Sequence, residues 1–501
     1  MSVVDRDAGP TVARPTLRVS RFTRLAQVFV ISSILLFASS ALMGPSMAEP
    51  RLPGAGPLRA FTAAPAPWMV TCVLWIAIAS GAVGVGCAWA AMVGGWRPAL
   101  SQVWGWGAVS ATVLALVPPL GSSDITNYAV YGRLATLGMN PYLGSADELA
   151  HLHDPVGVGY SGLWHNTPSV YGPVATFWEY ATSLVTGSSM RMFVIMTQLA
   201  ALVIFLASAW LLDRVVRDDA TQRLRVAVLW TANPLLIYLL VNAAHVDVLA
   251  VFFGVAAIAA LRRSVVGAGV LVGLATCTKV SFALYVAGLA WALRKRTRDL
   301  WAFCVATVLT AVILVTPFLP EIYHPLSVAA KYVSHESPWH FTLTPLTSLL
   351  PTSTVHTLLS VCVWALVALV AWRMWAVMPR QPVMETDVRL AGAWAATVLS
   401  ISWLLCSTYF FAWYDAMAWA PLALIPASRL DLVLLIRTTV VALASVPGLD
   451  FHPTGALGWA MTFVSNSVAP VVGVGLILVV VFGGHRLLLS TDGRQQAIQV
   501  A

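Results

Sequence analysis

The chain has 501 residues, of which 59% are hydrophobic and 10% are charged, and its mean hydropathy is +0.80. Water-soluble proteins of any size are less apolar than this, so the composition excludes a soluble fold and predicts an all-α polytopic membrane protein. The net charge of +8 is not gathered in a basic, aromatic-rich soluble segment, so a nucleic-acid partner is excluded as well.

The first 24 residues form a basic arm that we expect to lie in the cytoplasm. An apolar run at 25–46 follows the arm. This run is longer than the apolar part of a signal peptide, and many similar runs come after it, so we predict an anchored first helix rather than a cleaved leader.

Charged residues interrupt the rest of the chain at intervals close to the roughly 20 residues that a helix needs to cross a bilayer. We therefore predict a single transmembrane domain, residues 25–485, followed by a cytoplasmic tail, residues 486–501. Its hydrophobic segments, about fourteen in number, are 25–46, 67–94, 101–120, 190–212, 225–241, 245–261, 265–277, 280–293, 300–318, 355–374, 389–409, 413–428, 431–447 and 463–484.

The segments 265–277 and 280–293 are too short to cross a bilayer singly. Arg263 and Arg294 flank them, and both are expected on the cytoplasmic side. The stretch 265–293 therefore reads as a short hairpin that turns at Cys277, Thr278 and Lys279. Irregular backbone at membrane depth needs protein or water around it, so this turn is predicted to face an internal cavity.

Positive charge gives the orientation, because Lys and Arg favour short cytoplasmic loops. The bias places both termini in the cytoplasm and the loops 121–189 and 319–354 on the extracytoplasmic side. The basic residues outside or near the outer face are Arg51, Arg59, Arg133, Arg191, Lys279 and Lys331. Most histidines and several acidic residues fall in the outer loops or at outer helix ends, as expected if chemistry or sugar binding occurs there; ordinary solvated loops are the alternative.

The loop 121–189 is too long for a simple connection. Ser122 or Ser123 can cap a helix whose first turn holds Asp124, and Asn127, Tyr128 and Tyr131 would share its face. A positive helix end favours an ionised carboxylate by roughly 0.3–1 kcal/mol, which makes Asp124 a candidate proton acceptor. An ordinary stabilising first-turn aspartate is the alternative.

Two amphipathic segments are expected in this loop, both lying on the membrane surface. Asn140-Pro141-Tyr142 should end the first, and Tyr171-Gly172-Pro173 should open the second, which runs through Trp178. The aromatic side chains could form a wall for sugar rings, although interfaces also collect aromatic residues for anchoring alone. The wall candidates are Trp164, Tyr171 and Trp178.

Several polar groups lie at the outer ends of the apolar segments. Lys279 is costly in an apolar hairpin unless it is paired or faces water, and snorkelling to the interface is the alternative. His245 and Asp247 lack the third ligand of a metal site, and the six cysteines form no CxxC pair, so no metal site is predicted.

Four stretches carry a family resemblance: SSDITNYAVYGRLATLGMNPY, then YGP, NPLLIYLLVNAAHVDVLAVF and LVGLATCTKVSF. They resemble the actinobacterial α-(1→6)-mannosyltransferases of lipomannan and lipoarabinomannan synthesis, which belong to the GT-C class of multi-span glycosyltransferases. The resemblance covers about residues 100–430. Its most specific part is the loop at Asp124, whereas the NP and HxD patterns also occur in other GT-C families.

The resemblance implies a GT-C fold and an inverting glycosyltransferase on the outer face of the plasma membrane. The donor would be polyprenyl-phosphate-mannose, and the acceptor a growing α-(1→6)-mannan glycolipid. A GT-C enzyme carries its catalytic carboxylate in the first long extracytoplasmic loop, which selects Asp124 as the general base. No cofactor is required, and dependence on a divalent metal is left open.

The same resemblance suggests roles for the remaining polar and aromatic groups. Lys279 is the first candidate for binding the donor phosphate, ahead of Arg133 and Lys331. Candidates for contacts with the sugar or acceptor are Asn127, Tyr128, Tyr131, Trp164, Tyr171, His245, Asp247, Trp413 and Tyr414. For His245 and Asp247 a purely structural network with Lys279 is the alternative, and Asp415 could be a salt-bridge partner.

Other functions compete with this reading. Another GT-C activity, such as arabinofuranosyl transfer or a different mannosyl linkage, would use the same motifs. A lipid or sugar transporter or flippase would also have many spans, but transporters usually show repeated halves, and the sequence has no convincing repeat. A non-catalytic assembly protein is the third alternative. Acceptor length and oligomeric state are not predicted.

Overall fold

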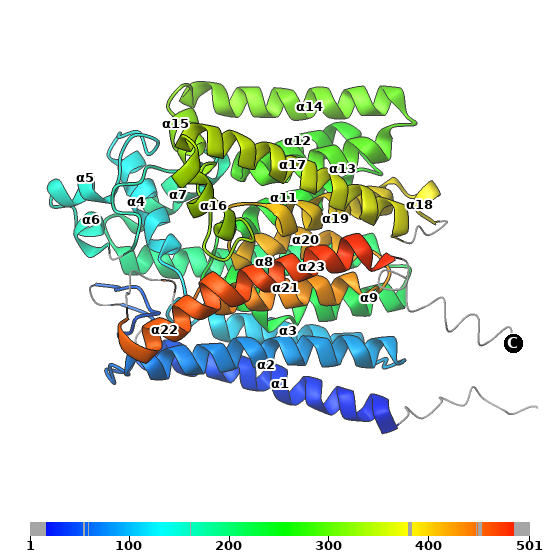
Figure 1. Ribbon diagram of the computed structural model, residues 1–501, viewed down its shortest axis with the longest axis horizontal. Coiled ribbons are helices and arrows are strands. Elements are labelled where there is room, and N and C mark those ends of the chain that lie inside the picture. Colours follow the sequence, from blue (N-terminus) through cyan, green and yellow to red (C-terminus); the bar gives the residue numbers. More distant parts are fainter. Residues whose placement is uncertain are drawn as a thin grey trace, which may run out of the picture.

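The computed structural model describes residues 17–484, apart from 54–55, 59, 161, 379–382, 447 and 449–452. Within these ranges every regular element is helical, which confirms the all-α prediction (Figure 1). Residues 1–16 of the predicted arm and the predicted tail 486–501 lie outside the described residues. Residues 17–24 of the arm belong to the first helix, so this helix begins eight positions before the predicted boundary at 25.

Seven helical stretches in the described ranges are long and apolar enough to cross a membrane. An eighth is added if the bent pair Ala220–Thr231 and Pro234–Asn242, which meet at 44°, is one span. The seven are α1 (Leu17–Leu42), α2 (Pro67–Val93), α8 (Met190–Val215), α14 (Thr297–Val315) with η4 (Thr316–Phe318), α17 (Thr352–Val377), α19 (Val388–Cys406), and α22 (Gly455–Phe463) continued by η6 (Val464–Val468) and α23 (Ala469–Phe482). The protein is thus a polytopic membrane protein.

Each predicted hydrophobic segment overlaps at least one helix of the described residues, but several of these helices are shorter than a bilayer crossing. α11 has 14 residues, so it is only about 21 Å long at 1.5 Å per residue. The shorter elements are α3 (Leu100–Ala115), α9 (Ala220–Val226), η1 (Ala227–Thr231), α10 (Pro234–Ile237), η2 (Tyr238–Asn242), α11 (Asp247–Ala260), α12 (Val265–Thr278), η3 (Val280–Phe282), α13 (Ala283–Leu293), η5 (Ala412–Asp415), α20 (Ala416–Leu422) and α21 (Leu430–Ala444).

The long helices lie side by side, and the small helices of the two long loops gather at one end of the bundle, on the left in Figure 1. α9 and α18 (Val383–Thr386) lie at the opposite end. The predicted outer loops therefore share one end, away from the arginine-rich connection at α9. The elements at the loop end are α4 (Asp124–Thr136), α5 (Ala146–His151), α6 (Pro155–Gly159), α7 (Pro173–Thr186), α15 (Tyr323–Ala329) and α16 (His340–Leu349).

The two amphipathic segments of the first loop differ in their surroundings. Every residue from Asp124 to Gly132 in α4 is buried, and α4 packs against α7. α4 has no face left for a membrane surface, so the prediction of an interfacial helix is wrong there. α7 buries polar residues and exposes the apolar Phe177, Leu184 and Val185. That outward apolar face suits a membrane interface, and for α7 the interfacial position stays a prediction.

The predicted short hairpin is present. α12 ends at Thr278, Lys279 takes an extended conformation with φ −148° and ψ 121°, and η3 and α13 return the chain. The turn is thus a single extended residue between two short helices, at the position that the sequence indicates.

A buried ion pair joins four elements of the bundle. Arg225 of α9 is 1% exposed and donates to both carboxylate oxygens of Asp431 in α21, with Nη1 at 2.6 Å from Oδ2. The same guanidinium donates to the carbonyls of Ile425 and Leu422, and Trp89 of α2 donates to Asp431. Arg225 is therefore a structural residue, although it lies in the arginine-rich stretch 214–225, which the sequence places on the cytoplasmic side.

Replacing Arg225 by Met should lower the free energy of unfolding by about 3–5 kcal/mol, because the Asp431 charge would stay buried without its partner. Chemical unfolding in detergent measures this change. Arg217→Met is the matched control, since Arg217 and its partner Asp218 are both exposed and such pairs contribute about 1 kcal/mol or less. Equal losses in the two variants would contradict the structural role.

Candidate active site

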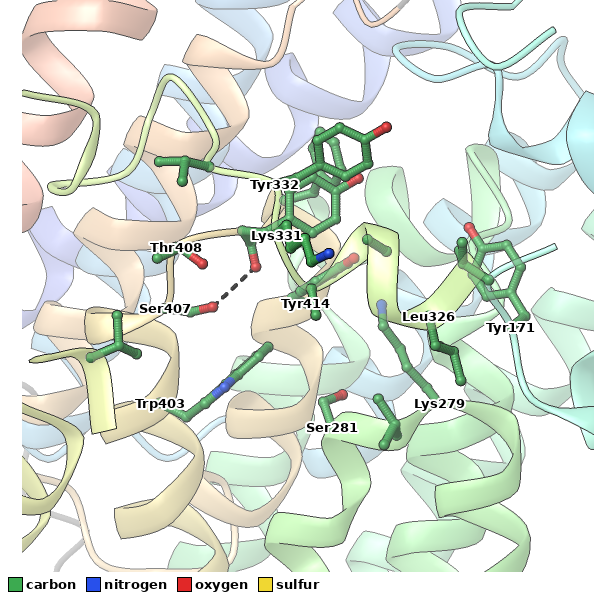
Figure 2. A pocket seen from close by; sticks show the side chains of 18 of the residues that line it. Tyr171, Lys279, Ser281, Leu326, Lys331, Tyr332, Trp403, Ser407, Thr408 and Tyr414 are labelled. Carbon is green, nitrogen blue, oxygen red and sulfur yellow. Dashed lines mark hydrogen bonds between the residues drawn. The ribbon is translucent and has the colours of Figure 1, made fainter. Parts of the chain in front are cut away.

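A cavity of about 440 Å³ lies among the two long loops, the 265–293 hairpin, α17 and the segment 403–414 (Figure 2). Lys279, Lys331 and Tyr414 lie around one part of this cavity in the close view. The predicted site residues that line it are Asp124, Asn127, Tyr131, Trp164, Tyr171, Lys279, Lys331 and Tyr414.

Asp124 is the first residue of α4, and its side chain reaches the cavity. Its backbone N–H donates to the Ser122 hydroxyl at 3.1 Å, while Ser123 occupies the N-cap position without a side-chain cap bond. The preceding turn requires Gly121, because its φ is +76° and a Cβ there would lie 1.8 Å from the Tyr238 hydroxyl. The carboxylate therefore starts a helix at a fixed point of the cavity wall.

Asn242, the last residue of η2, forms hydrogen bonds to the chain just before this turn. Its side-chain oxygen accepts from the Leu120 N–H at 3.0 Å, and its amide donates to the carbonyls of Leu114 and Pro118, both at 3.0 Å. Asn242 is completely buried. These bonds bring the residues before Asp124 and those before His245 together, although they are far apart in sequence.

His245 lies directly behind Asp124. Its Nδ1 is 3.5 Å from the Asp124 Oδ2, and its ring stacks on Trp413 with a centroid distance of 3.6 Å and an interplanar angle of 11°. Neither His245 nor Trp413 is among the cavity-lining residues. The prediction that these side chains contact the sugar does not fit this placement, because the cavity is lined by their neighbours: His245 contacts Asp124, and Trp413 stacks on Phe411.

Lys279 reaches the cavity from the hairpin turn. Its Nζ is 2.6 Å from the Asp247 Oδ1 and 3.3 Å from the centroid of the Tyr414 ring. Ring and carboxylate both stabilise the ammonium, and a lysine has further N–H groups that can face the cavity. Asp247 does not line the cavity, so its predicted sugar contact does not fit the structure either. Its pairing with Lys279 matches the structural alternative.

The other two candidate cations lie in different positions. Lys331 is exposed, lines the cavity and makes no ion pair with the described part of the chain. Arg133 lies off the cavity wall, and its Nε pairs with the Asp154 Oδ2 at 2.8 Å. Asp154 also caps α6 through the Val156 N–H, so Arg133 braces the loop rather than facing a phosphate.

Aromatic side chains form much of the remaining wall. Tyr171 lies edge-on to Tyr128 at 5.3 Å, and the Tyr131 hydroxyl donates to the Thr167 carbonyl at 3.0 Å. Burial raises the pKa of Tyr131 and Tyr171 well above the ordinary value, so both hydroxyls stay neutral. Tyr128 and Trp178 border a different, small cavity behind this wall.

Sequence reasoning missed part of the wall and its support. Trp403, Tyr409 and Tyr332 line the cavity, and the dense aromatic run around residues 409–414 was the available signal for Tyr409. The second outer loop is held there by the Trp339 indole, which donates to the Cys406 carbonyl at 2.7 Å.

A buried network fixes the turn that carries Trp413 and Tyr414. Asp415 is 0% exposed, pairs with Arg437 and accepts from the Thr438 hydroxyl at 2.7 Å. Asp415 is therefore the salt-bridge partner that the sequence allowed. The position of Arg437 within an apolar segment was the signal that could have identified its partner.

Comparison with known proteins identifies the family. A family model described as "Alpha-(1->6)-mannopyranosyltransferase, N-terminal domain" matches residues 28–296, which is more than half of the chain. Alpha-(1->6)-mannopyranosyltransferase B of Corynebacterium glutamicum is 29% identical over 132 residues, 26% of this chain and 22% of the relative.

Two mycobacterial proteins give similar matches. A probable alpha-(1->6)-mannopyranosyltransferase of Mycolicibacterium smegmatis is 29% identical over 137 residues, 27% of this chain and 24% of the relative. An alpha-(1->6)-mannopyranosyltransferase of Mycobacterium tuberculosis is 28% identical over 137 residues, 27% of this chain and 23% of the relative. The matched stretches thus span less than a quarter of each curated relative. The match of the family model over residues 28–296 shows that this chain belongs to the alpha-(1->6)-mannopyranosyltransferase family.

Proposed function

We propose that the protein is an inverting mannosyltransferase that extends an α-(1→6)-mannan glycolipid, using polyprenyl-phosphate-mannose at the outer face of the plasma membrane. The family membership and the names of the relatives support mannose as the sugar and α-(1→6) as the linkage. The observation that carries the proposal is one cavity lined by a helix-start carboxylate, Asp124, and by two lysines, Lys279 and Lys331.

The proposed reaction needs one general base and cations for the leaving group. An acceptor hydroxyl attacks C1 of the mannose while Asp124 takes its proton, and the bond between C1 and the phosphate oxygen breaks. The electron pair of that bond goes to the phosphate, where Lys279 and Lys331 stabilise the added charge. Attack on the face opposite the phosphate converts a β-linked donor into an α-glycoside.

The shape of the cavity wall suits a lipid-linked donor. α15 and α17 line one side with apolar residues such as Leu326, Leu359 and Val363. Trp364 and Val280 also line the cavity and are 57% and 63% exposed, on helices that would face lipid. A prenyl chain could thus remain in the bilayer while its phosphate reaches the lysines.

The outer face is proposed from the distribution of charge. The cavity lies at the end of the bundle that carries the two long loops, and the arginine-rich α9 connection lies at the other end. Because Lys and Arg favour cytoplasmic loops, the cavity end is assigned to the extracytoplasmic side.

A donor screen tests the proposal. Purified protein in lipid vesicles is given polyprenyl-phosphate-linked mannose, arabinose or glucose, together with an α-(1→6)-mannan glycolipid, and the product linkage is analysed. We expect a new α-(1→6)-mannosyl residue from the mannose donor alone. Arabinosyl transfer would assign another GT-C activity, and movement of the donor across the vesicle without transfer would assign a flippase.

A further inference from the structure

Glu179 is a buried carboxyl group behind the active-site wall with no assigned role. It lies on α7, is 1% exposed, and neither of its carboxyl oxygens has a hydrogen-bond partner in the described residues. Burial raises its pKa well above the ordinary value, so the group is neutral and carries an O–H donor. A buried donor without a partner is costly, which calls for a partner close by.

His245 is the matching acceptor. Its ring is 0% exposed, contacts Asp124 and stacks on Trp413, and neither Nδ1 nor Nε2 has a hydrogen-bond partner in the described residues. His245 and Glu179 border the same cavity of about 10 Å³, which leaves room for one water at most. No direct hydrogen bond joins the two groups in the described residues, so a single water in this cavity is what would connect them.

Two other polar side chains border this small cavity, and each already makes one hydrogen bond. The Thr197 hydroxyl donates to the Phe193 carbonyl at 2.8 Å, and the Tyr128 hydroxyl accepts from the Val246 N–H at 3.4 Å. Much of the rest of the lining is apolar, including Ala201 and Leu249.

We propose that Glu179 is a positioning residue that orients Asp124 through His245. By donating to Nε2 through one water, Glu179 keeps the ring proton on Nδ1, the nitrogen that lies 3.5 Å from the Asp124 Oδ2. That contact holds one carboxylate oxygen of Asp124 and leaves the other to face the cavity. The inference rests on the proposed function, because it assigns the support of the proposed base.

The pH profile of transfer is the readout that a merely structural role would not move. Without the Glu179 donor, the ring proton can move to Nε2, and the Nδ1 lone pair then faces Asp124. A lone pair there repels the carboxylate oxygen 3.5 Å away, so the acidic limb of kcat/KM should shift to higher pH. The tyrosines around the pair, Tyr128, Tyr131 and Tyr142, have pKa values raised by burial and stay neutral. The Lys279 ammonium, paired with Asp247, also acts on Asp124.

Two substitutions of Glu179 test the role of its hydrogen-bond donor. Glu179→Met removes the donor, and we expect kcat to fall roughly 10- to 100-fold, as for outer-shell partners of a metal-binding histidine, with the acidic limb shifted upward. Glu179→Gln keeps an N–H donor. It should retain the activity of the unmodified protein and the acidic limb of its kcat/KM profile. Glu148→Met, at an exposed position of the same loop, is the control and should change neither.

A second background keeps the test decisive if Glu179→Met weakens folding. In His245→Asn the amide presents a donor without a tautomer choice, so adding Glu179→Met should leave the acidic limb where His245→Asn alone puts it. Loss of activity in Glu179→Gln equal to that in Glu179→Met, or an unshifted limb in Glu179→Met, would overturn the inference. Absence of transfer by the unmodified protein would instead overturn the proposed function.

Discussion

Asp124→Asn should lower the rate of mannosyl transfer by about 10²- to 10⁴-fold, the usual contribution of a positioned general base. The amide has the same shape as the carboxylate and can still lie at the start of α4, but it cannot accept the proton of the acceptor hydroxyl. The measurement is transfer from labelled polyprenyl-phosphate-mannose in membranes that contain equal amounts of each variant.

Asp147→Asn is the matched control for this prediction. Asp147 lies on α5 in the same loop, its side chain is half exposed, and its one ionic contact in the described residues is His165 at 3.8 Å. Its removal should leave transfer within about twofold, since exposed pairs contribute little. If Asp124→Asn were as active as Asp147→Asn, Asp124 would not be the base.

The arrangement of helices was largely predictable because bilayer thickness constrains it. The lengths of the apolar runs between charged residues located the helical segments. The two arginines beside the 265–293 stretch predicted the turn at Lys279. The start of α1 was not predictable in the same way. Arginines at the end of a transmembrane helix can stay helical while their side chains leave the bilayer, so charge does not define where a helix begins.

The residues of the site were predicted better than their distances from the cavity. Asp124 and Lys279 reach the cavity as expected, because a helix start and an intramembrane charge are local features. His245 and Asp247 share the HxD motif, yet both lie one layer back, each paired with one of those two residues. Distance from the cavity depends on packing between segments, which a single sequence does not report.

Glu179 illustrates a second limit. The spacing of α7 shows two different faces, but in a membrane protein the apolar face can point outward, as Phe177 and Val185 do here. The rule that apolar residues are buried therefore selects the wrong face. Glu179 reads as a solvated loop residue in the sequence and is a buried one in the structure.

Lys279→Met should combine a loss of activity with a loss of stability. Removing a cation from the leaving phosphate is expected to lower kcat by roughly 10²- to 10³-fold, by analogy with the loss of one donor to a developing negative charge. The change also leaves Asp247, which is 3% exposed, without its partner 2.6 Å away. A stranded buried carboxylate costs about 3–5 kcal/mol, so low activity alone would not separate catalysis from folding.

The double variant Asp247→Asn with Lys279→Met separates the two effects. Both partners are then neutral, so no charge is stranded, and the free energy of unfolding in detergent should recover most of the loss seen in Lys279→Met. Transfer activity should stay low, because the cavity still lacks the cation that faces the phosphate. Recovery of activity together with stability would show that Lys279 acts only by neutralising Asp247, and Lys331 would then be the lysine left to bind the donor phosphate.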